Sequence, residues 1–344
     1  MANTLVEYKN LVADALKAGI AETIYLESPW LKYLPFKSIA GVSLKYKMEL
    51  SAAAADFQDV GGTWIEGTPT WDYRNTDLYI LGGDADVDAF TIATMGTQEN
   101  IEADIISLKA KAIAQRFEAC AILGRTTAVA TYSASNIFKG LIRKICECEG
   151  TTDSGLATDL DGSVYTNPAS GNNTQVLLGA SNASAALTLD MLDALIGIVK
   201  PAPSHLVMAR IMRDKISSLA RAAGNNLKHD NDELGMPVVR YGDQIILVDD
   251  AVPINANDQS TLVAAPASYT PTTTWAAGND TSPIFAVRIA EDGLCGLSNG
   301  MIQVEDIGKL ETKDAERTRI KFYCGLALFN KRAAGVLWGT NVAG

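Results

Sequence analysis

Residues 41–81 read GVSLKYKMELSAAAADFQDVGGTWIEGTPTWDYRNTDLYIL. Its first part alternates apolar and polar residues as a β-strand does, with one face formed by Val42, Leu44, Tyr46 and Met48. The middle is small and Gly-rich, which favours a mobile loop, and the strand pattern resumes through Trp71, Tyr73 and Leu78. We therefore expect a long protruding hairpin, and because a lone two-stranded hairpin is marginal in water, it should lie on another surface.

The clearest helix covers residues 98–123. Two apolar stripes follow helical spacing: one is Ile101, Ile105, Leu108 and Ala112, and the adjoining one is Ile106, Ile113, Phe117 and Cys120. Thr97 can cap the start and Gly124 can end the helix. We expect a long structural beam whose apolar face includes Ile105 and Leu108.

The segments on either side of these two features have different characters. Residues 1–40 combine a short amphipathic helix with an extended stretch broken by Pro29 and Pro35, so this arm should need a partner surface. Residues 141–300 alternate helices with short strands, and SPIFAVRIAEDGLCGL (282–297) has the pattern of a hairpin. Residues 301–330 read as two long strands around a charged turn. The whole chain is expected to be α+β.

Charge and composition exclude some classes of protein. The chain has 29 Lys plus Arg against 40 Asp plus Glu, a formal net charge of -11, which argues against binding nucleic acid through its phosphates. No stretch approaches the roughly 18 apolar residues that a membrane span needs. Five scattered Cys fit a reducing cytoplasm better than a disulfide framework.

The most tempting catalytic motif is Gly296-Leu-Ser298-Asn-Gly300, which matches the G-x-S-x-G nucleophile elbow. In that fold the acid and the His follow the Ser, whereas His205 and His229 both precede it here. A tight turn between strands explains the motif better. His205 heads an apolar strand and is expected to be a packed residue.

Candidate metal ligands are equally incomplete. Asp84, Asp86 and Asp88 imitate the start of a calcium loop, but Gly and the closing Glu are missing at the required positions, so the three should share the solvent face of a strand. Cys146 and Cys148 form C-x-C without a second pair. The acidic cluster Asp230-Asn231-Asp232-Glu233 reads as a solvated loop. We assign no catalytic, cofactor-binding or metal-binding residue, and expect a structural protein.

The order of arm, long hairpin, beam helix, α/β insertion and returning strands resembles the major capsid proteins of tailed phages, whose fold is named after phage Hong Kong 97. The stretches that carry the resemblance are YLPFKSIAGVSLKYKMEL (33–50), LYILGGDADVDAF (78–90), GMPVVRYGDQIILVDDAVP (235–253) and FYCGLALFNKRAAGVLWG (322–339). It covers essentially the whole chain, through order and spacing and not through fixed catalytic residues.

The resemblance implies four parts for this chain. Residues 1–40 would be the N-terminal arm and 41–81 the extended loop. A peripheral domain would comprise 82–140 and 300–330, with the spine helix at 98–123. An axial domain would comprise 141–299 and 331–344.

It also implies partners and a location. Such subunits assemble with themselves as hexamers and pentamers into an icosahedral shell around double-stranded DNA, without reading its sequence. A portal protein, a separate scaffolding protein and a decoration protein are further implied partners, and no membrane is involved. The subunit would be made in the cytoplasm of a host bacterium and reside in the virion. No extra scaffolding segment precedes the arm at Met1, so a separate scaffold is expected if one is needed.

Some shells of this kind are locked by Lys–Asn bonds that use a lysine of the loop. The loop tip between Ser51 and Gly67 has no lysine, and Lys45 and Lys47 are expected to face solvent, so we assign no crosslink. Two alternatives stay open: an encapsulin-like shell that encloses an enzyme, and an acidic α/β metal-dependent enzyme that uses Asp86 or Asp88.

Overall fold

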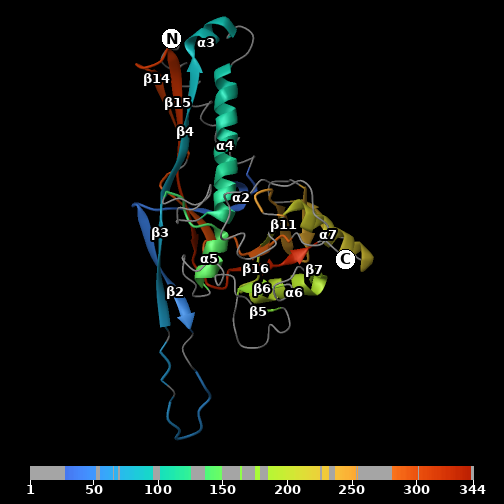
Figure 1. The fold of residues 1–344 in the computed structure, drawn as a ribbon. Coiled ribbons are helices and arrows are strands. Elements are labelled where there is room, and N and C mark those ends of the chain that lie inside the picture. Colours follow the sequence, from blue (N-terminus) through green and yellow to red (C-terminus); the bar gives the residue numbers. More distant parts are fainter. Residues whose placement is uncertain are drawn as a thin grey trace, which may run out of the picture.

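A computed structural model gives the arrangement of the chain (Figure 1). The residues that it describes are 28–51, 55–64, 66–68, 70–95, 101–124, 136–148, 163–164, 175–178, 185–224, 227–231, 237–252, 254, 281–300 and 302–341. Residues 1–27, the expected cap Thr97, and most of 149–184 and 253–280 lie outside this part. Its helices are α2 (Pro29–Tyr33), α3 (Ala89–Met95), α4 (Ile101–Leu123), α5 (Leu141–Cys148), α6 (Leu189–Ile198) and α7 (Arg210–Ala222).

The smaller of two main sheets carries the long strands of the molecule. It consists of β1 (Phe36–Ser38), β13 (Leu294–Ser298), β15 (Ala315–Leu328) and β14 (Gln303–Lys309), and β4 (Tyr79–Asp88) pairs with β15 along ten residues. In Figure 1, β4 and β15 run beside α4 in the upper half of the view. The expected pair of long strands after residue 301 is therefore present as β14 and β15.

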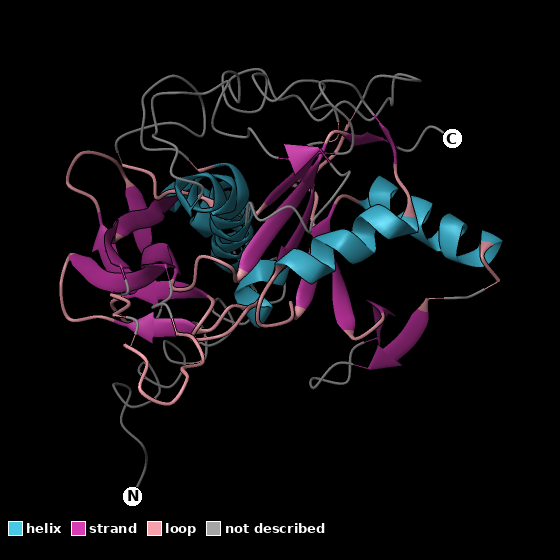
Figure 2. Cartoon of the chain, turned by 90° about the horizontal axis from the view of Figure 1, so that it is seen from below, coloured by secondary structure: helices cyan, strands magenta, loops and turns pink. Residues whose placement is uncertain are grey.

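The larger sheet has the strand order β5-β6-β16-β12-β8-β11-β10-β9. Its strands are β5 (Ser163–Val164), β6 (Val176–Leu178), β16 (Ala334–Trp338), β12 (Ile284–Val287), β8 (His205–Met208), β11 (Gln244–Val248), β10 (Pro237–Tyr241) and β9 (Lys228–Asn231). A short parallel pair joins β7 (Ala185–Ala186) to β17 (Thr340–Asn341). Figure 2 shows the strands of the two main sheets as separate groups with helices between and beside them.

The central strands of the larger sheet are apolar on both faces because both faces are covered. All four residues of β8 are buried. Leu206 and Met208 belong to a core shared with α6 and α7, whereas Val207 belongs to the main core with α4 and α5. A strand with helices on both sides reads as a continuous apolar run without alternation, which explains the sequence HLVM at this position.

Of the two apolar stripes on α4, the structure buries the second. Leu108 is 65% exposed, whereas the buried residues of α4 are Ile106, Ala110, Ile113, Ala114, Phe117, Cys120, Ala121, Ile122 and Leu123. The expectation that Ile105 and Leu108 form the packing face is therefore wrong for Leu108; Ile105 is partly buried against the core. Periodicity located both stripes, but only the positions of β4, α2 and α5 around the helix decide which stripe is covered.

Gly124 ends α4, as expected, and the reason is a close approach. The end of α4 meets the start of α5, where the backbone N–H of Gly140 donates to the carbonyl of Gly124 at 2.9 Å. A Cβ atom on Gly124 would collide with the carbonyl oxygen of Phe138, and one on Gly140 would lie 2.7 Å from the carbonyl of Cys120. Both glycines are needed for this crossing.

Residues 28–40 belong to the core of their own chain. Trp30, Leu31 and Leu34 are buried, and β1 lies parallel to β13. The ring of Phe36 packs between those of Phe117 and Phe322, at 6.1 and 5.6 Å between centroids. The expectation that all of residues 1–40 lack a surface on their own molecule is therefore wrong for residues 28–40.

The expected hairpin at residues 282–297 is also wrong. β12 lies between β8 and β16 in the larger sheet, and β13 lies between β1 and β15 in the smaller sheet. The intervening turn, closed by the ion pair of Arg288 with Asp292, carries the chain from one sheet to the other. The sequence indicated both strands, but it did not indicate the strands with which they pair.

The burial pattern of α4 can be tested with two aliphatic side chains two residues apart. We expect Ile106→Ala to lower the free energy of unfolding by about 2–5 kcal/mol, because it leaves a cavity in the main core. Leu108→Ala is the matched control and should change it by less than about 0.5 kcal/mol. Urea denaturation of the full chain measures both, and equal losses would contradict the orientation of the helix.

Candidate assembly surface

The hairpin of β2 (Ser43–Ser51) and β3 (Thr70–Asp77) forms a sheet of its own. The two strands are antiparallel, with Leu44 opposite Thr76 and Lys47 opposite Tyr73. Among the described strands, no third one pairs with either of them. Figure 1 shows the hairpin continuing away from the body as a long ribbon that ends in a loop.

The base of the hairpin is fixed to the body by its inner face. Met48 is buried in the main core, and the ring of Tyr46 packs edge-on against Phe329 at 4.9 Å between centroids. The ammonium group of Lys144 on α5 donates to the buried hydroxyl oxygen Oγ1 of Thr76 at 3.0 Å. These contacts set the direction in which the ribbon leaves the body.

The outer face and the tip of the hairpin expose large apolar side chains. On β3, Trp71 is 48% and Tyr73 is 73% exposed; in the tip, Phe57, Val60 and Trp64 are each more than 80% exposed. Grouped exposed aromatic side chains of this kind mark sites of protein–protein contact, whereas single ones need no explanation. The sequence pattern predicted both strands, but the pairing register places the aromatic residues of β3 on the face opposite Tyr46.

The two lysines at the start of the loop face solvent, as expected. The ammonium group of Lys47 lies 4.4 Å from the centroid of the Trp71 ring, a cation–π contact, and Lys45 is exposed beside it. Lys47 therefore shields part of the aromatic surface at the base of the ribbon, while the tip has no such cover among the described residues.

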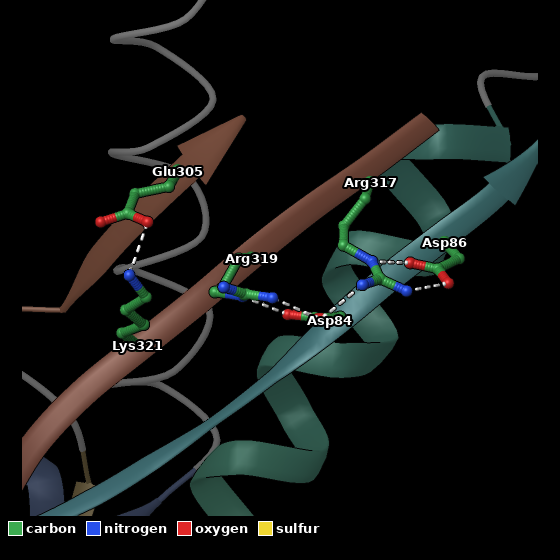
Figure 3. Close-up of polar contacts among 6 residues, drawn as sticks. All are labelled: Asp84, Asp86, Glu305, Arg317, Arg319 and Lys321. Atoms are coloured by element: carbon green, nitrogen blue, oxygen red, sulfur yellow. Dashed lines mark hydrogen bonds and ion pairs between the residues drawn. The ribbon is translucent and has the colours of Figure 1, made fainter. Parts of the chain in front are cut away.

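A ladder of ion pairs crosses the outer face of the smaller sheet (Figure 3). The guanidinium of Arg319 donates to both carboxylate oxygens of Asp84 at 2.6 and 2.9 Å, and that of Arg317 donates to both oxygens of Asp86 at 2.6 and 2.7 Å. Lys321 on β15 donates to Glu305 on β14 at 2.6 Å. Three acids and three bases thus neutralise one another across three strands.

These contacts shift proton equilibria in the expected direction. The hydrogen bonds from Arg319 hold the pKa of Asp84 below its ordinary value, and those from Arg317 do the same for Asp86. Both carboxylates are ion-paired with an arginine guanidinium. The interpretation as a strand face is confirmed by the burial of Ala85 and Val87 on the opposite side.

Asp88 differs from the other two acids of the imitated calcium loop. Its oxygen Oδ1 accepts from the backbone N–H groups of Phe90 and Thr91, at 2.9 and 3.4 Å, and so caps the start of α3. The sequence analysis predicted neither this cap nor the arginine partners of Asp84 and Asp86. The signal for the partners was present, because Arg317 and Arg319 alternate with the same period of two as Asp84 and Asp86.

The G-x-S-x-G stretch forms the end of β13 and a turn. Ser298 is buried and its hydroxyl donates to the carbonyl of Gly300, whose positive φ of 91° suits glycine. Gly296 leaves room for Phe36, since a Cβ there would lie 2.5 Å from the phenylalanine ring. Both glycines of the motif therefore have structural reasons.

The two histidines lie in the larger sheet, whereas Ser298 lies in the smaller one. His205 is buried on β8, its Nδ1 is 2.8 Å from the hydroxyl of Ser204, and its ring is 5.0 Å from that of Tyr33. His229 lies exposed on the edge strand β9. Neither histidine therefore lies in the same sheet as Ser298.

The remaining candidates are peripheral. Asp230 lies exposed on β9 and forms an ion pair with Arg240, so the first part of the acidic cluster is a strand and not a loop; residues 232 and 233 are outside the described part. The backbone of Cys146 and Cys148 lies in α5. Their side chains are outside the part of the chain that the structure describes. In the described residues, no three His, Cys, Asp or Glu side chains gather as metal ligands would, and no helix is long and apolar enough to span a membrane.

Comparison with known proteins identifies the fold. No family model and no curated protein sequence matches the chain. Among solved structures, it is similar to the capsid of a native GTA particle (TM-score 0.60, 13% identity, 92% of this chain and 91% of that one). It is also similar to the SrpI encapsulin of Synechococcus elongatus PCC 7942 (0.55, 15%, 92% and 89%) and to a protein of Mycobacterium phage Adephagia (0.54, 14%, 92% and 91%). The chain therefore has the α+β capsid fold named after phage Hong Kong 97.

The ladder can be tested through one of its acids. We expect Arg319→Gln to raise the pKa of Asp84 toward 3.8, because the substitution removes the charge and the paired donors that favour the carboxylate. The lowered pKa contributes stability above about pH 4 that is lost as the pH falls through the folded-state pKa. NMR titration of the carboxyl carbon measures the change.

Arg288→Gln is the matched control for this titration. It breaks the separate ion pair with Asp292 and should leave the pKa of Asp84 unchanged. A titration of Asp84 that is the same in the Arg319 variant and the wild type would show that the ladder does not exist in solution.

Proposed function

We propose that this chain, which has the Hong Kong 97 capsid fold, is the major capsid protein of a tailed bacteriophage. Its subunits assemble with one another as hexamers and pentamers into an icosahedral head. The observation that carries the proposal is the hairpin, whose tip exposes Phe57, Val60 and Trp64 to water. In a monomer these apolar side chains remain exposed to water, whereas a neighbouring copy can cover them.

The four parts of the fold take the following roles in this proposal. Residues 41–81 are the extended loop, 82–140 and 300–330 form the peripheral domain around α4, and 141–299 with 331–344 form the axial domain. Residues 28–40 of the expected arm are packed in the core of their own chain and are not available to a neighbour. Heterologous contacts of a loop and an arm with the next copy close into rings.

The contents and partners of the shell follow from charge and from the family. A net charge of -11 suits a container that holds double-stranded DNA without binding it tightly. A portal protein, a separate scaffolding protein and a decoration protein complete the proposed particle, which is made in the host bacterial cytoplasm. The subunit itself has a structural and not a catalytic role. The metal-enzyme alternative depends on Asp86 or Asp88; Asp86 is paired with Arg317, and Asp88 caps α3.

A second candidate is an encapsulin-like shell, favoured by the likeness to the encapsulin of Synechococcus elongatus over 92% of this chain. Electron microscopy of particles from cells that produce the protein, with nuclease treatment and analysis of their contents, separates the two. Large particles filled with DNA support the phage head, and small particles that contain a protein cargo support the compartment.

The role of the hairpin tip can be tested by a double substitution. We expect Phe57→Ser with Trp64→Ser to abolish shells, because it removes the apolar surface that a second copy would cover. The melting temperature should stay within about 2 °C of the wild type, because substitutions of exposed residues usually change the free energy of unfolding by less than about 0.5 kcal/mol. Negative-stain microscopy and size-exclusion chromatography measure assembly.

Asp59→Ser, in the same exposed tip, is the control that keeps both aromatic rings and should assemble normally. Normal shells from the double variant would refute the role given to the tip. A double variant that unfolds would place the two side chains in the core, contrary to their exposure.

A further inference from the structure

Asp249 is a carboxyl group buried where three parts of the chain meet. It directly follows β11 and is 1% exposed. Its Oδ2 accepts from the indole nitrogen Nε1 of Trp30 in α2 at 2.5 Å, and its Oδ1 accepts from the backbone N–H of Ala251 at 2.7 Å. Trp30 is itself fully buried, so this contact connects α2 to the end of the larger sheet.

A second carboxyl group reaches Asp249 from α4. The side chain of Glu118 hydrogen-bonds to Asp249. Two carboxyl groups can share a hydrogen bond only if one of them holds a proton. Among the described residues, the titratable groups that face Asp249 are Glu118 from α4 and Asp250 from its own turn, while α2 contributes the uncharged indole.

We propose that Asp249 and Glu118 share a proton and thereby form a pH-sensitive latch that holds α4 and α2 against the larger sheet. Trp30 orients the Asp249 carboxyl, and the proton allows Glu118 to approach it without repulsion. The latch is a property of the single subunit and goes beyond the proposed function. It would stand even if the subunit did not build a phage head.

The direction of the pH effect follows from burial. Burial disfavours the ionised form and raises the pKa of Asp249 from 3.8 to about 6, while the hydrogen bonds from Ala251, Trp30 and Glu118 act in the opposite direction. Because the folded-state pKa lies above the unfolded value, the contribution to stability is fully present below about pH 4 and is lost as the pH rises through about 6. The junction is therefore tighter at pH 5 than at pH 8.

Groups other than Asp249 are the same in the wild type and in the Asp249 variant, so their titration cancels when the two are compared. Asp84, Asp86 and Asp292 have lowered pKa values and titrate in more acidic solution. The sequence has only two His, and both remain in every variant below, so their contribution cancels when variants are compared.

The test is urea unfolding of the full, unassembled chain between pH 5 and pH 8. We expect the wild type to lose about 10-fold in its folding equilibrium constant over this range relative to Asp249→Asn, since a folded-state pKa of about 6 leaves about one pH unit of the effect above pH 5. The amide is neutral at every pH, so the variant should lack this step. Asp243→Asn, a change of an exposed residue in the turn between β10 and β11, should keep the wild-type profile.

A second variant keeps the test decisive if Asp249→Asn does not fold. Glu118→Gln supplies a permanent neutral donor, which favours the ionised Asp249, so the step should move to lower pH. Profiles of the wild type that run parallel to Asp249→Asn, or a step that stays at the same pH in Glu118→Gln, would overturn the latch.

Discussion

A two-stranded antiparallel ribbon cannot cover its own faces, and this constraint governs the molecule. β2 and β3 satisfy the backbone hydrogen bonds between them, but among the described strands no third one pairs with either. Burial of the exposed apolar side chains at its tip would be favourable, and the single chain does not provide it. The fold is thus built with a surface that a second molecule can complete.

The body to which the ribbon is attached supplies the rigidity that such a contact needs. Phe117 on α4 lies within 6.1 Å of the rings of Phe36, Phe138 and Phe322, so the helix, β1 and β15 pack through one aromatic cluster. The same core meets the larger sheet through Trp30 and Asp249. A force applied to the hairpin is therefore transmitted to a packed core and not to a loose loop.

The sequence predicted the elements whose signal is local. Alternation located β2, β4 and β15, and helical spacing located α4, because these patterns depend only on the period of each element. The errors arose where the answer depends on a distant segment: which stripe of α4 is covered, which strand pairs with β12, and where residues 28–40 lie. In the candidate surface, Asp84 and Asp86 were placed on the correct face, but their arginine partners are more than 200 residues away in the sequence. The buried Asp249 was missed because its sequence context, VDDAV, does not distinguish it from the exposed Asp250.

The central claim is that the tip of the hairpin contacts another copy of the chain. The most direct measurement places a photo-crosslinking amino acid at position 64 and mixes ¹⁴N- and ¹⁵N-labelled subunits before irradiation. Mass spectrometry then distinguishes crosslinks within one chain from crosslinks between two. We expect mixed-isotope crosslinks from the tip to the body of a second subunit; crosslinks confined to single chains would show that the tip does not contact another copy.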